Sequence, residues 1–347
     1  MKRVLTIAAA AGALGLFSAD IANAQTLGGF PIREPGAGSG AGSGGGGGSK
    51  PSKGAQQIIV DANGPGPYKT ISKAVDDIAE GGVIYVMHGV YDESVRLTKS
   101  VFLQGDRGPG SGVEIRAPLN APCLSFTPKE GTAHAVVANI SLQSMVNTAG
   151  EACVQVASGV FTMKESDVLG ASAAPAVRIS GGTVMLEKNR ISAGSEGVRL
   201  EQNHTLSQTF IIDNKIGGNK VGVDIASGSR ADVVVSGNEI FDNLETGIKS
   251  SGYGGASLIG NKIRNNKGSG IYLERFSKLA LVRYNEIVKN AGDGVAVPFG
   301  ANGIIEDNDI VGNDGLGIYV REGLEPKITN NFIENNKGDG KRPKRSR

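Results

Sequence analysis

The chain has 347 residues, of which 20% are charged and 39% are hydrophobic, with a formal net charge of +2 and no tryptophan. This near-balanced charge excludes a body built to bind polyanions, so nucleic acid is not an expected partner. No stretch after the first 24 residues approaches 18 consecutive apolar residues, so a membrane-spanning helix is not expected either.

Residues 1–24 have the pattern of a secretory signal peptide. Lys2 and Arg3 form a basic start, residues 4–17 are apolar, and Ala22-Asn23-Ala24 is a small-residue cleavage site. The pattern predicts a mature chain that begins at Gln25 and is periplasmic or secreted.

Residues 25–54 are predicted to be a disordered linker, because the run at 36–49 is almost entirely Gly, Ser and Ala. A tether to a wall, membrane or partner is the alternative interpretation. At the other end, residues 341–347 form a tail with five Lys and Arg residues. We interpret this basic tail as a solvated end, with contact to anionic glycans as its alternative.

The stretch 70–80 predicts an amphipathic helix. Ile71, Ala74, Val75 and Ile78 recur at helical spacing, Thr70 suits an N-cap, and glycines at 81 and 82 would end the helix. Such a helix would cover the exposed core of a first coil, as a repeat protein requires at its ends.

A phrase of the form Asn-x-Ile-x-x-Asn, followed within a few residues by Gly-[Ile/Val]-x-[hydrophobic], repeats from residue 189 onward at intervals of 23 to 25 residues. The first Asn residues are Asn189 (a looser copy), Asn214, Asn238, Asn261, Asn285, Asn308 and Asn331. This period, with β-branched residues and Gly/Asn turns, predicts a solenoid of parallel strands whose coils rise by roughly 4.8 Å. We therefore expect an all-β, right-handed, single-stranded parallel β-helix over residues 55–340, with an N-terminal capping helix.

The repeat also predicts where its own residues lie. Asn261 and Asn285 should be interior ladder residues bonded to copies on neighbouring coils, whereas Lys262 should point outward. The second Asn and the Gly of each phrase should form the corners, where the left-handed backbone conformation is least costly.

Cys123 and Cys153 are the only cysteines. Both lie where later coils have the Gly-[Ile/Val]-x-[hydrophobic] phrase, so they should be neighbours on adjacent coils, within disulfide range. A disulfide and two reduced thiols in a stacked interior column both fit this placement.

Two sets of motifs resemble known families. The stretch Tyr68-Lys69-Thr70-Ile71, with later segments such as Val101-Phe102-Leu103-Gln104-Gly105, resembles the opening of pectinesterases and other pectin-lyase-like proteins. The Asn-x-Ile and Gly-Ile phrases resemble the parallel β-helix repeats of the NosD-type family. The resemblance implies a right-handed β-helix on which glycan binding, lyase, hydrolase, esterase or epimerase activity is common. The catalytic motifs of pectinesterases, polygalacturonases and alginate epimerases have no match here.

One outward column of the repeat is mostly a ladder of alternating charge. Its exception is Glu286 beside Asp309, two carboxylates one coil apart. Surface carboxylates tolerated by Lys262 are the ordinary interpretation, and a dyad or a Ca²⁺ site is the functional one. No other metal or cofactor is expected.

A second outward column, with the residues that follow it, combines aromatic, basic and acidic side chains, as a sugar-binding groove does. The candidate ligand-binding residues are Arg199, Asp224, Lys249, Tyr272, Glu274, Arg275, Phe299, Tyr319 and Arg321. A mixed surface without a ligand is the alternative.

Three functions fit these patterns. The first is an exported, non-catalytic protein that binds a polysaccharide or cell-envelope glycan. The second is a lyase, hydrolase or C5-epimerase for uronate glycans, with Lys249 or Arg275 as base and Asp224 or Glu274 as its partner. The third is a scaffold that docks a partner. The sequence specifies neither the glycan nor the oligomeric state.

Overall fold

The computed structural model of the chain describes residues 54–107, 112–145, 150–201, 208–226, 232–251, 256–274, 280–300 and 303–340. The predicted signal peptide (1–24), residues 25–53 of the predicted linker and the basic tail (341–347) lie outside these residues.

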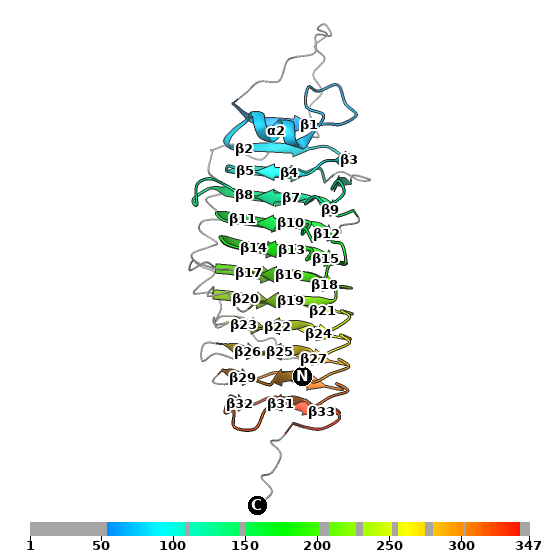
Figure 1. Ribbon diagram of the computed structural model, residues 1–347, viewed down its shortest axis with the longest axis vertical. Helices are drawn as coiled ribbons and strands as arrows, with labels where there is room; N and C mark the ends of the chain where they lie inside the picture. Colours follow the sequence, from blue (N-terminus) through cyan, green and yellow to red (C-terminus); the bar gives the residue numbers. More distant parts are fainter. Residues whose placement is uncertain are drawn as a thin grey trace, which may run out of the picture. The chain divides into compact units, whose positions relative to one another are not determined.

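The described residues form a right-handed parallel β-solenoid of three sheets, with one strand per sheet in each coil between the two ends (Figure 1). Sheet A consists of β1 (Ala55–Val60), β2 (Ile78–Val86), β5 (Val101–Gly105), β8 (His134–Ala138), β11 (Val160–Lys164), β14 (Thr183–Glu187), β17 (Gln208–Ile212), β20 (Asp232–Ser236), β23 (Ala256–Ile259), β26 (Leu281–Arg283), β29 (Ile304–Glu306) and β32 (Lys327–Thr329).

Sheet B consists of β3 (Gly89–Asp92), β6 (Val113–Arg116), β9 (Ser141–Gln143), β12 (Asp167–Leu169), β15 (Arg190–Ser192), β18 (Lys215–Gly217), β21 (Glu239–Phe241), β24 (Lys262–Arg264), β27 (Glu286–Val288), β30 (Asp309–Val311) and β33 (Phe332–Glu334). Sheet C consists of β4 (Val95–Leu97), β7 (Leu124–Phe126), β10 (Val154–Val156), β13 (Val177–Ile179), β16 (Glu196–Leu200), β19 (Val221–Ile225), β22 (Ile248–Ser250), β25 (Ile271–Leu273), β28 (Val295–Val297) and β31 (Ile318–Val320).

The predicted fold is confirmed, and its core follows from the alternation of side chains along each strand. In sheet B, Ile263 and Ile287 pair in register and are fully buried, while the flanking Lys262 and Glu286 point outward. The same register recurs in coil after coil, so apolar side chains stack into a continuous line of core.

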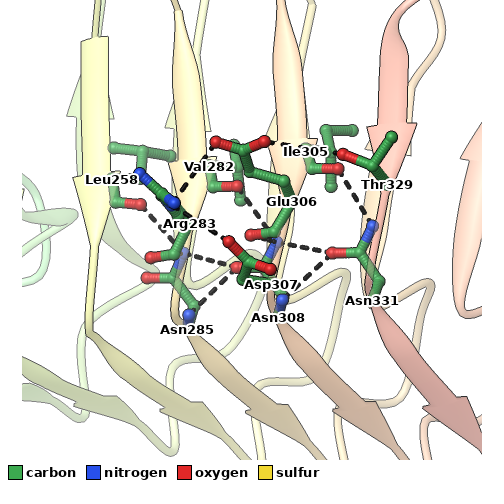
Figure 2. A network of polar contacts seen from close by, with 10 residues as sticks. All are labelled: Leu258, Val282, Arg283, Asn285, Ile305, Glu306, Asp307, Asn308, Thr329 and Asn331. Atoms are coloured by element: carbon green, nitrogen blue, oxygen red, sulfur yellow. Dashed lines mark hydrogen bonds and ion pairs between the residues drawn. The ribbon is translucent and has the colours of Figure 1, made fainter. Parts of the chain in front are cut away.

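Two ladders of buried asparagines run through the coils from residue 189 onward. The Asn261 amide donates to Asn285 Oδ1 at 3.0 Å and to the Val235 carbonyl at 2.8 Å, and its backbone N–H also donates to Asn285 Oδ1 at 3.0 Å. Figure 2 shows the same pattern at Asn285, Asn308 and Asn331. Asn261 and Asn285 are each 1% exposed, so the predicted interior ladder is confirmed.

The predicted corners are wrong in detail. The left-handed residue is the one before each ladder Asn, for example Tyr284 (φ 57°) before Asn285 and Lys289 (φ 55°) before Asn290. The Asn itself is committed to its column through both its amide and its backbone N–H, so the preceding residue makes the turn.

The repeated glycines from Gly197 to Gly317 have another role than the predicted one. At Gly247, a Cβ atom would lie 2.7 Å from both the Gly270 carbonyl oxygen and Ile263 Cγ2, and the residue does not have a positive φ. Glycine is therefore required there by the close approach of the next coil, and not by a left-handed corner.

The predicted helix is shorter than expected. Helix α2 spans Ile71–Asp77, with Thr70 as N-cap, and residues 78–80 already belong to β2, whose first residue Ile78 pairs with Ala55 of β1. Its first amides, at Ile71 and Ser72, donate to the Glu93 carboxylate at 2.7 and 2.8 Å. Its role as a cap of the first coil stays a prediction. None of the helices in the described ranges is long and apolar enough to cross a membrane.

Cys123 and Cys153 form a disulfide, with Cα atoms 4.7 Å apart. The bond joins the segments before β7 and β10, which are neighbours in sheet C. Of the two arrangements that the sequence allows, the structure therefore has the disulfide.

Candidate functional site

Sheet C carries the predicted outward column. Arg199 of β16 pairs with Asp224 of β19, Asp224 pairs with Lys249 of β22, and Lys249 pairs with Tyr272 of β25. Ala296 and Tyr319 continue the column on β28 and β31. Because the flanking residues of each strand face the core, the side chains of this column share one outer face.

The column begins earlier than the sequence indicated. Arg178 of β13 pairs with Arg199, and Gln155, Ser125 and Arg96 precede it on β10, β7 and β4. These strands lack the Asn phrase that aligns the later coils. The sequence does contain a signal for this extension, namely the similarity of Val177-Arg178-Ile179 to Val198-Arg199-Leu200.

A surface pocket of about 310 Å³ lies over β16, β19 and β22. It is lined by Glu196, Arg199, Lys220, Val221, Asp224, Ala226, Glu245, Thr246, Lys249 and Ser251. Three of the predicted binding residues, Arg199, Asp224 and Lys249, therefore belong to one pocket.

Asp224 is the unusual residue of this pocket, because it is only 7% exposed although it carries a carboxyl group. Arg199 Nη1 lies 3.6 Å from its Oδ2, while its Oδ1 is buried and has no hydrogen-bond partner within the described part of the chain. Burial raises the pKa of the Asp224 carboxyl, and the positive charges of Lys249 and Arg199 oppose this rise. A buried polar atom without a partner in a pocket is a feature of binding and catalytic sites.

The two arginines of this face are held in place by other carboxylates. Arg199 binds Glu196 at 3.0 Å and Glu201 at 2.6 Å, and Arg178 Nε lies 3.9 Å from Glu201. These ion pairs fix the guanidinium groups before any ligand arrives, which lowers the ordering cost of binding.

The aromatic end of the column lies on later coils. Tyr319 is 36% exposed, and the guanidinium of Arg321 lies over the Phe299 ring at 5.1 Å from its centroid. Glu274 follows β25 and is half-buried. Arg275 lies outside the described residues. The predicted ligand-binding set thus divides into a charged pocket and an aromatic–arginine surface further along the same sheet.

The other candidate pair, Glu286 and Asp309, lies on sheet B in direct register. Lys262 Nζ is 3.3 Å from Glu286, which compensates one of the two charges. Within the described ranges, no group of three His, Cys, Asp or Glu side chains is placed to hold a metal ion. The Ca²⁺ site at this pair stays a prediction.

A model of the right-handed beta helix region matches residues 152–297 and 247–342. Together these matches span more than half of the chain, so the protein belongs to the right-handed β-helix family. No curated protein sequence matches it significantly.

Among solved structures, the Dettilon tailspike protein (gp208) is similar with a TM-score of 0.58 at 12% identity, covering 81% of this chain and 66% of that one. A double mutant of the periplasmic alginate epimerase AlgG gives 0.49 at 18% identity, covering 75% and 62%. The A-module of the mannuronan C-5 epimerase AlgE4 from Azotobacter vinelandii gives 0.49 at 15% identity, covering 74% and 88%. This chain thus spans less than two thirds of the first two proteins. The likeness to the tailspike protein supports the fold alone.

Proposed function

We propose that this protein is an exported β-helix that binds a polysaccharide along the outer face of sheet C. The observation that carries the proposal is the Asp224 pocket, where a buried carboxyl with an unpartnered oxygen lies beside Arg199 and Lys249. Sugar hydroxyls both donate and accept hydrogen bonds, so carboxylates and cations fixed side by side suit them.

The same column supplies the apolar contacts that sugar rings need. Tyr272 lies next to Lys249 in register, and Tyr319 lies two coils beyond Tyr272. Phe299, stacked with Arg321, widens this surface at the end of the following strands. Because neighbouring coils are roughly 4.8 Å apart, these groups form a linear series of contacts that fits a linear polymer.

Binding of neutral and anionic glycans, measured by calorimetry, tests this proposal. Lys249→Ala and Tyr319→Ala should each weaken binding by about tenfold or more, equivalent to about 1.4 kcal/mol. Lys262→Ala, which removes an exposed lysine from sheet B, is the matched control and should bind normally. If no glycan binds, or if both sheet C variants bind as well as the control, the proposal is wrong.

A second candidate is an enzyme that acts on uronate glycans, and the raised pKa of Asp224 favours it. In an elimination, Lys249 would take the C5 proton while protonated Asp224 would donate its proton to the leaving glycosidic oxygen as the C4–O bond breaks. The unsaturated product absorbs in the ultraviolet. If no uronate polymer gives either ultraviolet absorbance or new reducing ends, cleavage by elimination or by hydrolysis is excluded.

Export is part of the proposal and is supported by two features. Residues 1–24 have the signal pattern, and the disulfide between Cys123 and Cys153 belongs to an oxidising compartment. The mass of the protein recovered outside the cytoplasm should correspond to a chain that begins at Gln25. Recovery of the full-length chain from the cytoplasm alone would contradict export.

A further inference from the structure

The outer face of sheet A has a column without any charged residue over ten successive strands, from β2 to β29. Its members are Val83, Phe102, Val136, Thr162, Met185, Phe210, Val234, Ser257, Leu281 and Ile304. They lie on the outer side of the sheet, because the next residue of each strand, such as Ile84 or Leu258, is buried in the core. Eight of the ten are half-buried, and Met185 and Phe210 are each 7% exposed. We call this set the sheet A column.

The fold does not require such a column. The corresponding outward position of sheet B is charged on eight of nine successive strands, namely Glu114, Ser141, Asp167, Arg190, Lys215, Glu239, Lys262, Glu286 and Asp309. Two outward faces of one solenoid thus differ in kind. An extended apolar surface on a soluble protein marks an interaction site.

The neighbouring outward column of sheet A widens this surface in the middle coils and surrounds it with charge. Ile212, Ser236 and Ile259 continue the uncharged surface on β17, β20 and β23. Lys164 and Glu187 precede them on β11 and β14, and Arg283 and Glu306 follow on β26 and β29. Each end of the uncharged stretch therefore carries one cation and one carboxylate on adjacent coils.

We propose that a second copy of this chain packs against the sheet A column. A surface without charges can lie against its own copy without burying a like-charged pair, and the mixed charges beside it allow cations of one copy to meet carboxylates of the other. Ten strands at roughly 4.8 Å span about 45 Å, and strands of three to five residues are roughly 10–15 Å wide. The outer face of sheet A over these strands, with its charged flanks, therefore measures about 450–700 Å² and approaches the about 800 Å² per partner of a standard interface.

This arrangement leaves sheet C open, so it does not depend on the proposed glycan binding. Surfaces that bind a lipid bilayer carry mainly basic residues around their apolar side chains, whereas the flanks of this column have both signs. A copy of the chain therefore fits the column better than a membrane surface does.

Sedimentation equilibrium of the full chain at about 100 µM, above the micromolar Kd of a modest interface, tests the proposal. The wild-type protein should be dimeric, and Val234→Glu and Leu281→Glu should each shift it to monomer. Val311→Glu and Val288→Glu place the same charge at half-buried outward positions of sheet B and should leave the dimer intact. Circular dichroism melts show that each variant is folded.

A wild-type monomer at this concentration overturns the proposal, and so does a dimer that survives both sheet A variants. Should the wild-type monomer instead bind vesicles of anionic lipid, and lose that binding in Val234→Glu, the column would serve a membrane surface and the second copy would be excluded.

Discussion

The coils before residue 189 and those after it form the same solenoid by different means. In the earlier coils, the core cluster includes Phe126, Phe161 and Met163, and a disulfide joins Cys123 to Cys153. From Asn189 onward, the core cluster contains only Ile, Val, Leu and Ala, and two Asn ladders follow the strands.

The difference shows what a parallel solenoid needs. Register along the axis has to be specified once per coil, because a slip of one residue would turn the core side chains outward. Buried amides specify register by hydrogen-bond geometry in the later coils. In the earlier coils, shape-specific packing of large side chains and one covalent bond take that role.

The largest loss of stability is expected from a substitution that breaks the Asn ladder. In Asn261→Leu, the backbone N–H and amide of Asn238 lose their acceptor and the Val235 carbonyl loses its donor. The Asn238 amide still donates to the Ile211 and Ser236 carbonyls. Two groups are therefore left unsatisfied, and at roughly 1–3 kcal/mol each the loss of stability should be about 2–6 kcal/mol. Thermal and denaturant melts measure it.

Lys262→Ala is the control on the next residue. Its ion pair with Glu286 is half exposed on both sides, so the change should stay within about 0.5 kcal/mol. Similar shifts for the two variants would show that the ladder does not specify register.

In the earlier coils, the corresponding change is Cys123→Ala with Cys153→Ala. The bond closes a separation of 30 residues, so its removal should destabilise the protein by about 3–4 kcal/mol. Reduction of the wild-type protein should lower its melting temperature similarly. An unchanged melting temperature would mean that packing alone specifies the earlier coils.

A smaller effect comes from the close approach between ladder coils. In Gly247→Ala, the new methyl group would lie 2.7 Å from the Gly270 carbonyl oxygen, which should cost about 1–3 kcal/mol. Gly131 has open space around it and lies among the earlier coils, so Gly131→Ala should change stability by at most about 0.5 kcal/mol. Equal costs would contradict the assigned role of the glycine column.

The smallest expected change in stability comes from Asp224, whose carboxyl group is buried among the ladder coils. Because the folded-state pKa of Asp224 is raised, its contribution to stability is present at low pH and is lost as the pH rises through that pKa. Asp224→Asn should therefore raise the melting temperature relative to wild type at pH 7 more than at pH 4, while it weakens glycan binding. A lower melting temperature at pH 7 would show that Asp224 is structural.

The Asn phrase makes the later coils predictable, since the outward residue of each sheet C strand lies ten or eleven residues after the first Asn and two residues after the repeated Gly. The position after this Gly is enough to assign Arg199, Asp224 and Lys249 to one face from the sequence. The column before Arg199 cannot be aligned in this way, since the earlier coils have no buried amide to mark their register. The pocket itself depends on how deeply Asp224 is buried, which a one-dimensional pattern does not encode.

The later part of the sheet A column can also be found in the sequence, by counting backward from the Asn phrase. From Met185 onward, its members lie four residues before the first Asn of each phrase, as Phe210 lies before Asn214 and Leu281 before Asn285. The phrase runs forward from the Asn, toward sheets B and C, so the strand that precedes it falls outside the repeat as the phrase defines it.

The ladder has a further consequence for the length of the molecule. Each ladder coil offers the same donors to the next coil and the same acceptors to the previous one, so a whole period is interchangeable with its neighbours. Removing residues 262–285 would join Asn261 directly to Glu286 and restore the Asn-x-Ile phrase. The solenoid would be shortened by one step of roughly 4.8 Å, with both ends unchanged. The length of such a solenoid can therefore change in single steps, by duplication or loss of one repeat.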